Sequence, residues 1–424
     1  MNGGVIISAP SSGAGKTTVT LAILRLLSNN GIHVRGAKSG PDYIDPRFHE
    51  AACGESCFNL DTWAMRPERI RSLASGNGIL VIEGAMGLFD GAPPDGKGAV
   101  ADLARMLELP VVLVIDSSRT GHSVAPLAAG FMNHDPDVYV AGLILNRVRS
   151  HRHESILRKA LAPLNLPVIA TLGESSAISL PSRHLGLVQA EERDNLRNLL
   201  DKAALDISGS FDMNAFLSLA APVPMTPKAN SIPPPAQKIA IARDGAFTFL
   251  YRHLADDWRS QGAEIAYFSP LADERVPKAE FIYLPGGYPE LHAKKIAGSG
   301  NFIESLRHAA YRGASIYGEC GGYMVLGRGL IDSRGCRHSM TGLLELETSF
   351  EAPSLHLGYR DLAPLCGPFK SRLKGHEFHY SAIVSENGNP LFAAWDSEGK
   401  ALSNIGLSKG RVSGSFAHVI DAAS

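Results

Sequence analysis

A glycine-rich segment near the start of the chain limits the possible folds more than any other feature. Residues 11–18 read Ser-Ser-Gly-Ala-Gly-Lys-Thr-Thr, between an apolar run, Val5–Ala9, and an amphipathic run, Lys16–Ser28. Glycines let backbone N–H groups approach phosphate oxygens closely, and a helix N-terminus behind them favours negative charge. The order strand, loop, helix therefore predicts a nucleotide-binding parallel sheet of the α/β class.

This loop departs at one position from the usual phosphate-binding pattern, because Pro10 stands where a glycine is usual. A chance glycine-rich turn before a helix is the alternative, but the flanking strand and helix favour ATP binding. Lysine in such a loop places a charge near the β- and γ-phosphates, and the next hydroxyl binds Mg²⁺. The expected ATP-binding residues are Gly13, Ala14, Gly15, Lys16, Thr17 and Thr18.

Apolar runs rich in β-branched residues alternate with amphipathic runs through the first half of the chain. Near-continuous apolar strands separated by helices are typical of a parallel sheet covered on both faces, with the loops after the strands gathered at one edge. The expected strands are Val5–Ala9, His33–Ala37, Ile79–Glu83, Val111–Asp116, Val140–Asn146 and Val168–Thr171. The expected helices are Lys16–Ser28, Ala99–Leu107, Ser123–Phe131 and His153–Ala162.

Chain length and a proline-rich segment together predict two domains. A chain of 424 residues exceeds what one hydrophobic core usually serves. Six prolines lie within residues 221–236, so this segment cannot pair in a central strand and should form an extended spacer. We expect a nucleotide-binding domain over 1–205, a proline-rich linker over 206–237 and a second α/β domain over 238–424. The strands expected to open that second domain are Lys238–Arg243, Glu264–Phe268, Phe281–Leu284 and Ala314–Tyr317.

Composition narrows the class of protein without identifying it. The formal net charge is −1, so neither nucleic acid nor an anionic membrane is an expected partner. No apolar run reaches about eighteen residues, and the phosphate loop begins too early for a cleaved signal, so we expect a cytoplasmic protein. Its cysteines should then be reduced thiols, and Cys53 and Cys57 lack the second Cys/His pair of a zinc site.

Polar residues follow the second and third expected strands. Two carboxylates beside a lysine suit Mg²⁺ binding and the positioning of a substrate carboxylate, although a solvated Asp-rich turn is the alternative. A carboxylate that ends a buried strand is costly unless it binds a metal or a donor. The expected metal ligands are Thr17, Asp42 and Glu83, and the residues expected to serve substrate and phosphoryl transfer are Lys38, Tyr43 and Asp45. Asp90 is a further candidate metal ligand at this edge, Asp116 is a candidate to support a metal ligand, and Asn146 is a candidate to face the nucleotide base.

A second candidate site centres on Cys320. Residues 317–322 read Tyr-Gly-Glu-Cys-Gly-Gly after an apolar stretch, which places the cysteine on a tight strand-to-helix turn. A lone cysteine is usually a small buried apolar residue, but flanking glycines permit the strained turn of a nucleophile. A helix N-terminus and a nearby histidine would lower the pKa of the thiol.

A thiol nucleophile needs a base and donors for an oxyanion. His376, His379 and His418 are the candidate bases, and we prefer His418 because it ends the last apolar run. Backbone N–H groups of Gly287 and Gly321 are the expected oxyanion hole. The alternative for the Pro-Gly-Gly sequence that contains Gly287 is a plain turn.

These motifs resemble two known families. The second domain is similar to class I glutamine amidotransferases, which share the Pro-Gly-Gly turn, the cysteine elbow and a late histidine, here His418. Most of that class carry a glutamate two residues after the histidine, where this chain has Ile420, so the group that would orient His418 is left open. The first domain resembles dethiobiotin-synthetase-like ATPases, which share the shortened phosphate loop, the lysine after strand 2 and the Glu-Gly pair after strand 3.

The whole chain resembles the cobyrinate/hydrogenobyrinate a,c-diamide synthase family. The resemblance implies an N-terminal P-loop parallel-sheet synthetase domain and a C-terminal class I glutamine amidotransferase α/β domain. It implies Mg²⁺ as cofactor and small molecules as partners, namely ATP as co-substrate, L-glutamine and a corrinoid carboxylate macrocycle, with a homodimer left open. The segments that carry it are residues 9–18, 38–46, 83–91, 180–190, 283–290 and 317–327.

The resemblance also implies a reaction. A peripheral carboxylate of hydrogenobyrinate or cobyrinate attacks the γ-phosphate of ATP and becomes an acyl phosphate. Cys320, with His418 as base, hydrolyses glutamine through a thioester, and the ammonia displaces phosphate to give the a- and c-amides of cobalamin biosynthesis. The alternatives are the same chemistry on another tetrapyrrole, as in cobyric acid synthase or nickel-sirohydrochlorin a,c-diamide synthase, and a phosphate-loop regulatory ATPase with an inactive amidotransferase domain.

Overall fold

The structure is a computed structural model that describes residues 2–174, 182–183, 186–187 and 195–423. The chain divides into two compact units, Met1–Ala229 and Asn230–Ser424. Each unit is built around its own sheet, so the expectation of a two-domain α/β protein is confirmed. Most of the segment 180–190, which contributes to the family resemblance, lies outside the described residues.

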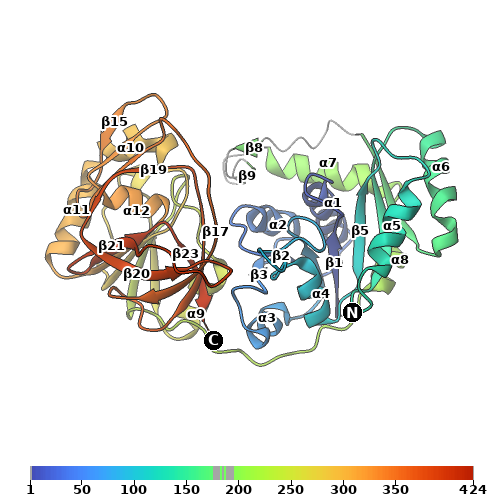
Figure 1. Cartoon of the computed structure of the whole chain (residues 1–424), viewed down its shortest axis with the longest axis horizontal. Helices are drawn as coiled ribbons and strands as arrows, with labels where there is room; N and C mark the ends of the chain where they lie inside the picture. Colours follow the sequence, from blue (N-terminus) through green and yellow to red (C-terminus); the bar gives the residue numbers. More distant parts are fainter. Residues whose placement is uncertain (1, 175–181, 184–185, 188–194, 424) are drawn as a thin grey trace. The chain divides into compact units, whose positions relative to one another are not determined.

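A seven-stranded parallel sheet forms the centre of the first unit, in the order β3-β2-β4-β1-β5-β6-β7. Helices cover both of its faces (Figure 1). The strands are β1 (Gly3–Ser8), β2 (Val34–Ser39), β3 (Phe58–Leu60), β4 (Ile79–Glu83), β5 (Val111–Asp116), β6 (Val140–Val148) and β7 (Val168–Gly173), with a separate pair β8 (Ser182–Arg183) and β9 (Gly186–Leu187). The helices are α1 (Lys16–Asn29), α2 (Asp45–Cys53), α3 (Pro67–Ala74), α4 (Val100–Leu107), α5 (Val124–Asn133), α6 (His151–Leu161), α7 (Leu196–Ser208) and α8 (Met213–Leu219). Across the described part of the chain, no helix is long and apolar enough to span a membrane.

The apolar strands build the core of this unit as the sequence predicts. Every residue of β1 is buried, and so is every residue of β4. All six strands and all four helices expected in this half are present, with ends shifted by no more than two residues. The helix α2 was not expected, because the Asp- and Pro-rich segment at its start resembles a turn. Pro46 fits there because the first turn of a helix needs no N–H from it.

The first unit continues beyond residue 205, where the linker was expected to begin. The helix α8 is capped by Asp212, whose side chain accepts a hydrogen bond from the N–H of Ala215 at 2.9 Å. Its Phe216 side chain is fully buried. Further along, the N–H of Gly4 donates to the carbonyl oxygen of Ala221 at 2.7 Å. Burial of an aromatic ring and pairing with β1 attach this stretch to the first unit.

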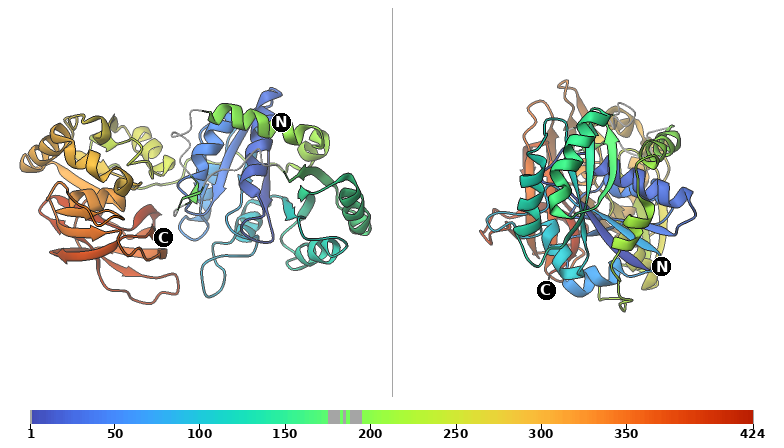
Figure 2. Two further views of the ribbon diagram at one scale, coloured as in Figure 1. Left: turned by 90° about the horizontal axis from the view of Figure 1, so that it is seen from above. Right: turned by 90° about the vertical axis from the view of Figure 1, so that its right-hand side faces the viewer.

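A ten-stranded mixed sheet forms the centre of the second unit, in the order β11-β10-β12-β13-β22-β21-β20-β17-β18-β23. Helices gather over its parallel part, and antiparallel strands form the rest of the unit (Figure 2). Its strands are β10 (Lys238–Ala242), β11 (Glu264–Phe268), β12 (Phe281–Leu284), β13 (Ser315–Glu319), β17 (His356–Pro364), β18 (Leu373–His379), β20 (Asn389–Trp395), β21 (Ile405–Lys409), β22 (Val412–Ser415) and β23 (His418–Ala422). A four-stranded sheet adds β14 (Gly329–Ile331), β15 (Arg337–Ser339), β16 (Glu345–Ser349) and β19 (Ala382–Asn387). The helices are α9 (Arg252–Ser260), α10 (Ala293–Gly298), α11 (Gly300–Tyr311) and α12 (Gly321–Leu326).

Candidate functional site

The phosphate loop joins β1 to α1 in the conformation that its glycines permit. Gly13 and Gly15 have φ values of 80° and 91°, a region that side chains rarely adopt. A Cβ on Gly15 would come 2.2 Å from the Nδ2 atom of Asn146. That Nδ2 atom donates to the carbonyl oxygen of Ala14 at 2.9 Å. Asn146, a candidate for the nucleotide base, therefore lies against the loop itself.

Lys16 begins α1 and reaches back across the loop. Its Nζ atom donates to the carbonyl oxygen of Ser11 at 3.2 Å and to that of Met86. Burial lowers the pKa of Lys16 to about 8, and the charge of Lys38 lowers it as well. An anion that approached this ammonium would favour its charged form. The loop thus holds a lysine whose charge would be stabilised by a phosphate.

A buried ionic cluster forms where β2 and β4 end. Lys38 Nζ lies 2.6 Å from Asp45 Oδ2 and 2.7 Å from Glu83 Oε1. Thr17 Oγ1 donates to Glu83 Oε1 at 2.6 Å and to Asp45 Oδ2 at 3.4 Å. Lys38 and Glu83 meet because they are Cα partners in the β2–β4 pair. The structure therefore brings together four of the residues expected to handle metal and phosphoryl transfer.

His49 belongs to the same cluster, although it was not among the residues predicted from the sequence. Its side chain is fully buried, with Nε2 at 2.6 Å from Glu83 Oε2 and Nδ1 at 3.5 Å from the Cys57 sulfur. The i, i+4 spacing from Asp45 puts both residues on one face of α2. Recognition of that helix would have revealed the histidine, but its first residues resemble a turn.

Burial and charge together set the protonation of this cluster. Burial alone would lower the pKa of Lys38, but Asp45 and Glu83 raise it above its usual value. Burial alone would raise the pKa of Glu83, but Lys38 and His49 hold it below its usual range. Burial, assisted by the charge of Asp42, raises the pKa of Asp45 to about 7. Lys38 and Glu83 are therefore charged at neutral pH, and Asp45 is poised to take up a proton.

The other acidic candidates lie beside this cluster rather than in it. Asp42 Oδ1 accepts from the N–H groups of Ile44 at 2.8 Å and Asp45 at 3.0 Å, so it caps the turn before α2. Next to Thr17 and Glu83 the structure places Asp45 rather than Asp42. Tyr43 is half-buried in the same turn.

Two more acidic candidates serve the loops at this edge. Asp90 Oδ2 accepts from the N–H of Gly87 at 2.9 Å. Asp116, at the end of β5, forms an ion pair with Arg147. Both side chains therefore have protein partners that hold the loops after their strands.

The oxygen donors of the cluster fit Mg²⁺. This ion prefers carboxylate and hydroxyl oxygens and is usually bound through one or two carboxylates together with substrate phosphates. Thr17, Asp45 and Glu83 supply such a set. In the regions that the structure describes, no three His, Cys, Asp or Glu side chains form a metal site by themselves. Phosphate oxygens would therefore have to complete the coordination.

Cys320 lies on the strained turn that the sequence predicts. It follows β13 and precedes the six-residue α12, with a φ of 48° and a ψ of −106°. A Cβ on Gly322 would come 1.9 Å from the carbonyl oxygen of Leu284, and one on Gly318 would come 2.8 Å from the carbonyl carbon of Gly322. No larger residue fits on either side of this turn, which is the geometry of a nucleophile elbow.

His418 approaches Cys320 across Gly286. A Cβ on Gly286 would lie 2.3 Å from His418 Cε1, 3.1 Å from His418 Nε2 and 3.2 Å from Cys320 Cβ. His418 Nε2 and Cys320 Cβ thus both lie close to the position that a Cβ on Gly286 would occupy. The other two candidate bases, His376 and His379, belong to β18. His376 pairs with His418 across the β18–β23 ladder, and the His379 ring stacks on Phe416 with ring centroids 3.9 Å apart.

Glu319, directly before the cysteine, is buried beside the same histidine. Its Oε2 atom lies 3.7 Å from His418 Nδ1 and accepts from the Tyr283 hydroxyl at 2.6 Å. Its Oε1 atom accepts from the N–H of Val419 at 3.0 Å. Glu319 was not among the residues predicted from the sequence, although it ends an apolar strand, the pattern that indicated Glu83.

Burial favours the neutral forms of the cysteine and the histidine. It raises the pKa of the Cys320 thiol above its usual value, and the charge of Glu290 adds to the effect. It lowers the pKa of His418, and His376 contributes to that shift. Burial also raises the pKa of Glu319 to about 7, although its hydrogen bonds oppose the shift. The lowered thiol pKa expected from the sequence is not found, because burial outweighs the short helix α12.

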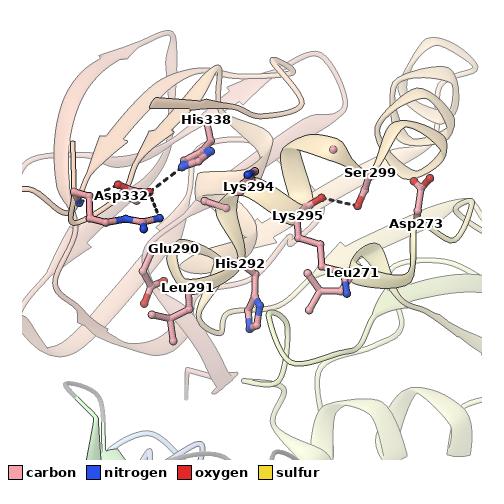
Figure 3. Close-up of a pocket in the computed structure, with 13 residues that line it drawn as sticks. Leu271, Asp273, Glu290, Leu291, His292, Lys294, Lys295, Ser299, Asp332 and His338 are labelled. Atoms are coloured by element: carbon pink, nitrogen blue, oxygen red, sulfur yellow. Dashed lines mark hydrogen bonds and ion pairs between the residues drawn. The ribbon is translucent and has the colours of Figure 1, made fainter. Parts of the chain in front are cut away.

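The expected oxyanion donors are neighbours, and a cavity lies near them. A Cβ on Gly321 would come 3.1 Å from the backbone nitrogen of Gly287. A cavity of about 620 Å³ is lined by residues 290–295, which follow Gly287, and by residues from other parts of the second unit. Charged groups of both signs line it (Figure 3). Glu290 links the two features, because it lines the cavity and its charge raises the pKa of Cys320. The charged lining residues are Asp273, Glu290, Lys294, Lys295, Asp332 and Arg334.

Comparisons with known proteins agree with this two-domain architecture. Residues 5–188 match a CobQ/CobB/MinD/ParA nucleotide binding domain, and residues 238–424 match a CobB/CobQ-like glutamine amidotransferase domain. The chain is 54% identical over 430 residues to the hydrogenobyrinate a,c-diamide synthase of Brucella abortus, covering 99% of this chain and 98% of that protein. It is 50% identical to the enzyme of that name from Rhizobium meliloti, covering 99% of each chain, and 48% identical to that from Rhodobacter capsulatus, covering 98% of each. The chain therefore belongs to the hydrogenobyrinate a,c-diamide synthase family.

Proposed function

We propose that this protein uses ATP and glutamine to amidate the a- and c-side-chain carboxylates of hydrogenobyrinate in cobalamin biosynthesis. One observation carries the proposal. One chain contains both a phosphate loop with carboxylates beside Thr17 and a cysteine elbow with His418. That chain matches proteins named hydrogenobyrinate a,c-diamide synthase over 99% of its length. The first site would activate a carboxylate, and the second would supply ammonia.

Activation is required because a carboxylate is a poor electrophile that repels nucleophiles. ATP would bind the loop from Gly13 to Thr18, and a carboxylate oxygen of the macrocycle would attack the γ-phosphorus and release ADP. Mg²⁺, held by Thr17, Glu83 and Asp45, would neutralise phosphate charge when bound. Lys16 and Lys38 would stabilise the charge on the transferring phosphoryl group. The product is an acyl phosphate, whose phosphate can leave.

Ammonia would come from glutamine at Cys320. The sulfur attacks the side-chain amide carbon, His418 accepts the thiol proton, and the same proton then goes to the leaving ammonia. The resulting thioester is hydrolysed by water to glutamate and the free thiol. The N–H groups of Gly287 and Gly321 would stabilise the oxyanion in both steps. We place the charged ends of glutamine near Glu290 in the neighbouring cavity, whose cationic groups suit a carboxylate.

The two half-reactions join when ammonia attacks the acyl carbon and phosphate leaves. The ammonia must reach the acyl phosphate unprotonated, because ammonium has no lone pair with which to attack. A second round on the other carboxylate gives the diamide. The proposal therefore requires that glutamine hydrolysis and amidation be separable by mutation.

The test compares Cys320→Ala with the unaltered protein, using hydrogenobyrinate, ATP and Mg²⁺, with either glutamine or ammonium as nitrogen donor. Mass spectrometry would count the amides formed. We expect the variant to lose glutamine-dependent amidation and to keep ammonia-dependent amidation. The matched control is Cys366→Ala, a half-buried cysteine of the same unit, which should keep both activities. Loss of both activities in Cys320→Ala, with the fold intact, would contradict the division of labour.

The same assay separates the alternatives. Cobyrinate, cobyrinate diamide and a nickel tetrapyrrole carboxylate, supplied in turn, would reveal a different macrocycle preference. ATP hydrolysis without any amide product would favour a regulatory ATPase. The strained turn, which requires glycine at 318 and 322, argues against a regulatory ATPase, because an inactive amidotransferase domain would not need that turn.

A further inference from the structure

A histidine that serves a thiol through one ring nitrogen needs its other nitrogen protonated and pointed at an acceptor. Neutral imidazole carries one proton, and the hydrogen bond made by one nitrogen decides which nitrogen stays free as the base. In this chain the residue two positions after His418 is Ile420, which is fully buried and offers no acceptor side chain. The acceptor has to come from another part of the second unit.

We propose that Glu319 is the positioning residue of the thiol site: its carboxylate accepts a hydrogen bond from Nδ1–H of His418, so that Nε2 is the unprotonated nitrogen that serves Cys320. This inference rests on the proposed glutaminase role of Cys320 and His418. It assigns to Glu319 an action through the histidine, without contact to glutamine.

The two edges of the histidine ring face different residues. Nδ1 lies 3.7 Å from Glu319 Oε2. Nε2 lies on the other side, where it and the Cβ of Cys320 border the point that a Cβ on Gly286 would occupy. Glu319 and Cys320, which are consecutive in the chain, thus lie at opposite edges of the His418 ring. The strained turn at Cys320 accounts for this, because an ordinary strand would continue straight past the histidine.

The Glu319 carboxylate is held in place for this role. Tyr283 donates to Oε2 from β12, and the N–H of Val419 donates to Oε1 from β23. The Tyr317 hydroxyl also faces this carboxylate. A carboxylate has about four acceptor positions, of which Tyr283, Val419 and Tyr317 use three, so it can still accept from Nδ1–H. The 3.7 Å separation is longer than a hydrogen bond. Such contacts are often long without substrate and shorten in the substrate complex.

The charged and titratable groups around the ring favour the same assignment. From β18, His376 and His379 disfavour the protonated form of His418, and Tyr283 and Tyr317 face Glu319 from β12 and β13. The charges of Glu290, Glu319 and Glu377 all raise the pKa of the Cys320 thiol. Glu319 is the carboxyl group that lies against Nδ1, and in its ionised form it would stabilise the imidazolium that forms when the thiol gives up its proton.

The test is the isosteric change Glu319→Gln, which keeps size and removes charge. We expect kcat for glutamine hydrolysis to fall by about a hundredfold, with KM for glutamine changed by less than about threefold. Ammonia-dependent amidation should be unchanged. Glu319→Asp should recover part of the loss, because the charge returns. Tyr283→Phe should cause a smaller loss, since the carboxylate stays while one of its anchors goes. The matched control is Glu304→Gln, an exposed glutamate of α11, which should change nothing.

A second measurement needs no variant. Nitrogen-15 NMR of histidine in the unaltered protein should show His418 with its proton on Nδ1. A proton on Nε2, or a Glu319→Gln variant whose kcat stays within about threefold, would overturn the assignment. An unaltered protein without glutaminase activity would overturn the proposed function instead, and the tautomer would still decide the role of Glu319.

Discussion

The two candidate sites hold their reactive groups in opposite electrostatic states. In the first unit, Lys38 and Glu83 are charged and paired in a buried cluster. In the second unit, burial favours the neutral forms of Cys320 and His418. Both sites lie at the carboxyl ends of parallel strands, so position in the fold does not explain the difference. The residues that surround the strand ends do.

This difference fits two kinds of task. A site that binds a polyanion gains from fixed charges, because they need no reorganisation when the substrate arrives. A site that must generate a nucleophile gains from a thiol that stays protonated until the substrate is bound. We infer that the first site is preorganised and that the second becomes active on substrate binding. Variants at either site, and the pH dependence of the thiol, test that contrast.

The largest effect should follow from a methyl group placed between thiol and histidine. In Gly286→Ala the new Cβ would come 2.3 Å from His418 Cε1, so the ring has to move away from Cys320. Loss of a general base costs up to about 10⁴-fold, and we expect glutamine-dependent amidation to fall by about 10³-fold. Ammonia-dependent amidation should persist. Gly300→Ala is the matched control, because a Cβ there meets nothing within 4 Å. Equal loss with both nitrogen donors would remove the contrast between the sites.

Removal of a cation should damage the first site through stability as well as activity. Lys38→Met leaves Asp45 and Glu83 buried without their shared lysine, and breaking a buried ion pair this way costs about 3–5 kcal/mol. Hydrogen exchange of the β2 and β4 amides would report the loss. Without the lysine, repulsion between the two carboxylates raises the pKa of one of them. The loss of stability should therefore shrink as pH falls, because protonation of that carboxyl relieves the repulsion. Exposed Lys159→Met should show no change, and an equal effect there would contradict the account.

The sequence predicted what periodicity and glycine geometry control, and missed what depends on tertiary contact. The strands, the phosphate loop and the Cys320 turn follow from local patterns. His49 was missed because a turn-like sequence starts a helix. Glu319 was missed because its contact with Val419 joins residues 100 positions apart, at the ends of β13 and β23. Apolar patterns show that such strand ends are buried, but not which of them meet.

The pH dependence of thiol alkylation should distinguish a neutral pair from a preformed ion pair. Because burial raises the pKa of Cys320, its thiolate fraction in the substrate-free protein should grow about tenfold per pH unit up to at least about pH 9. The rate of Cys320 alkylation by iodoacetamide, followed by peptide mass spectrometry, should therefore rise about a hundredfold between about pH 7 and 9. The half-buried Cys366 provides an internal comparison. A rate that is constant from about pH 6 to 8 would indicate a thiolate–imidazolium pair before substrate binds, and the two sites would then be alike.

The smallest effect should come from a residue that supports the first site without bearing charge. Asn146 Nδ2 donates to the Ala14 carbonyl oxygen at 2.9 Å, and its loss in Asn146→Ala removes one buried hydrogen bond that shapes the loop. Such a bond contributes about 1 kcal/mol, so KM for ATP should rise by about fivefold while kcat stays nearly constant. Glutaminase activity should not change. If many fixed contacts preorganise the first site, the loss of any one of them should change KM for ATP only by such a small factor. A drop in kcat as large as that of Gly286→Ala would mean that the loop depends on a single contact, and preorganisation would then fail as the explanation of the contrast.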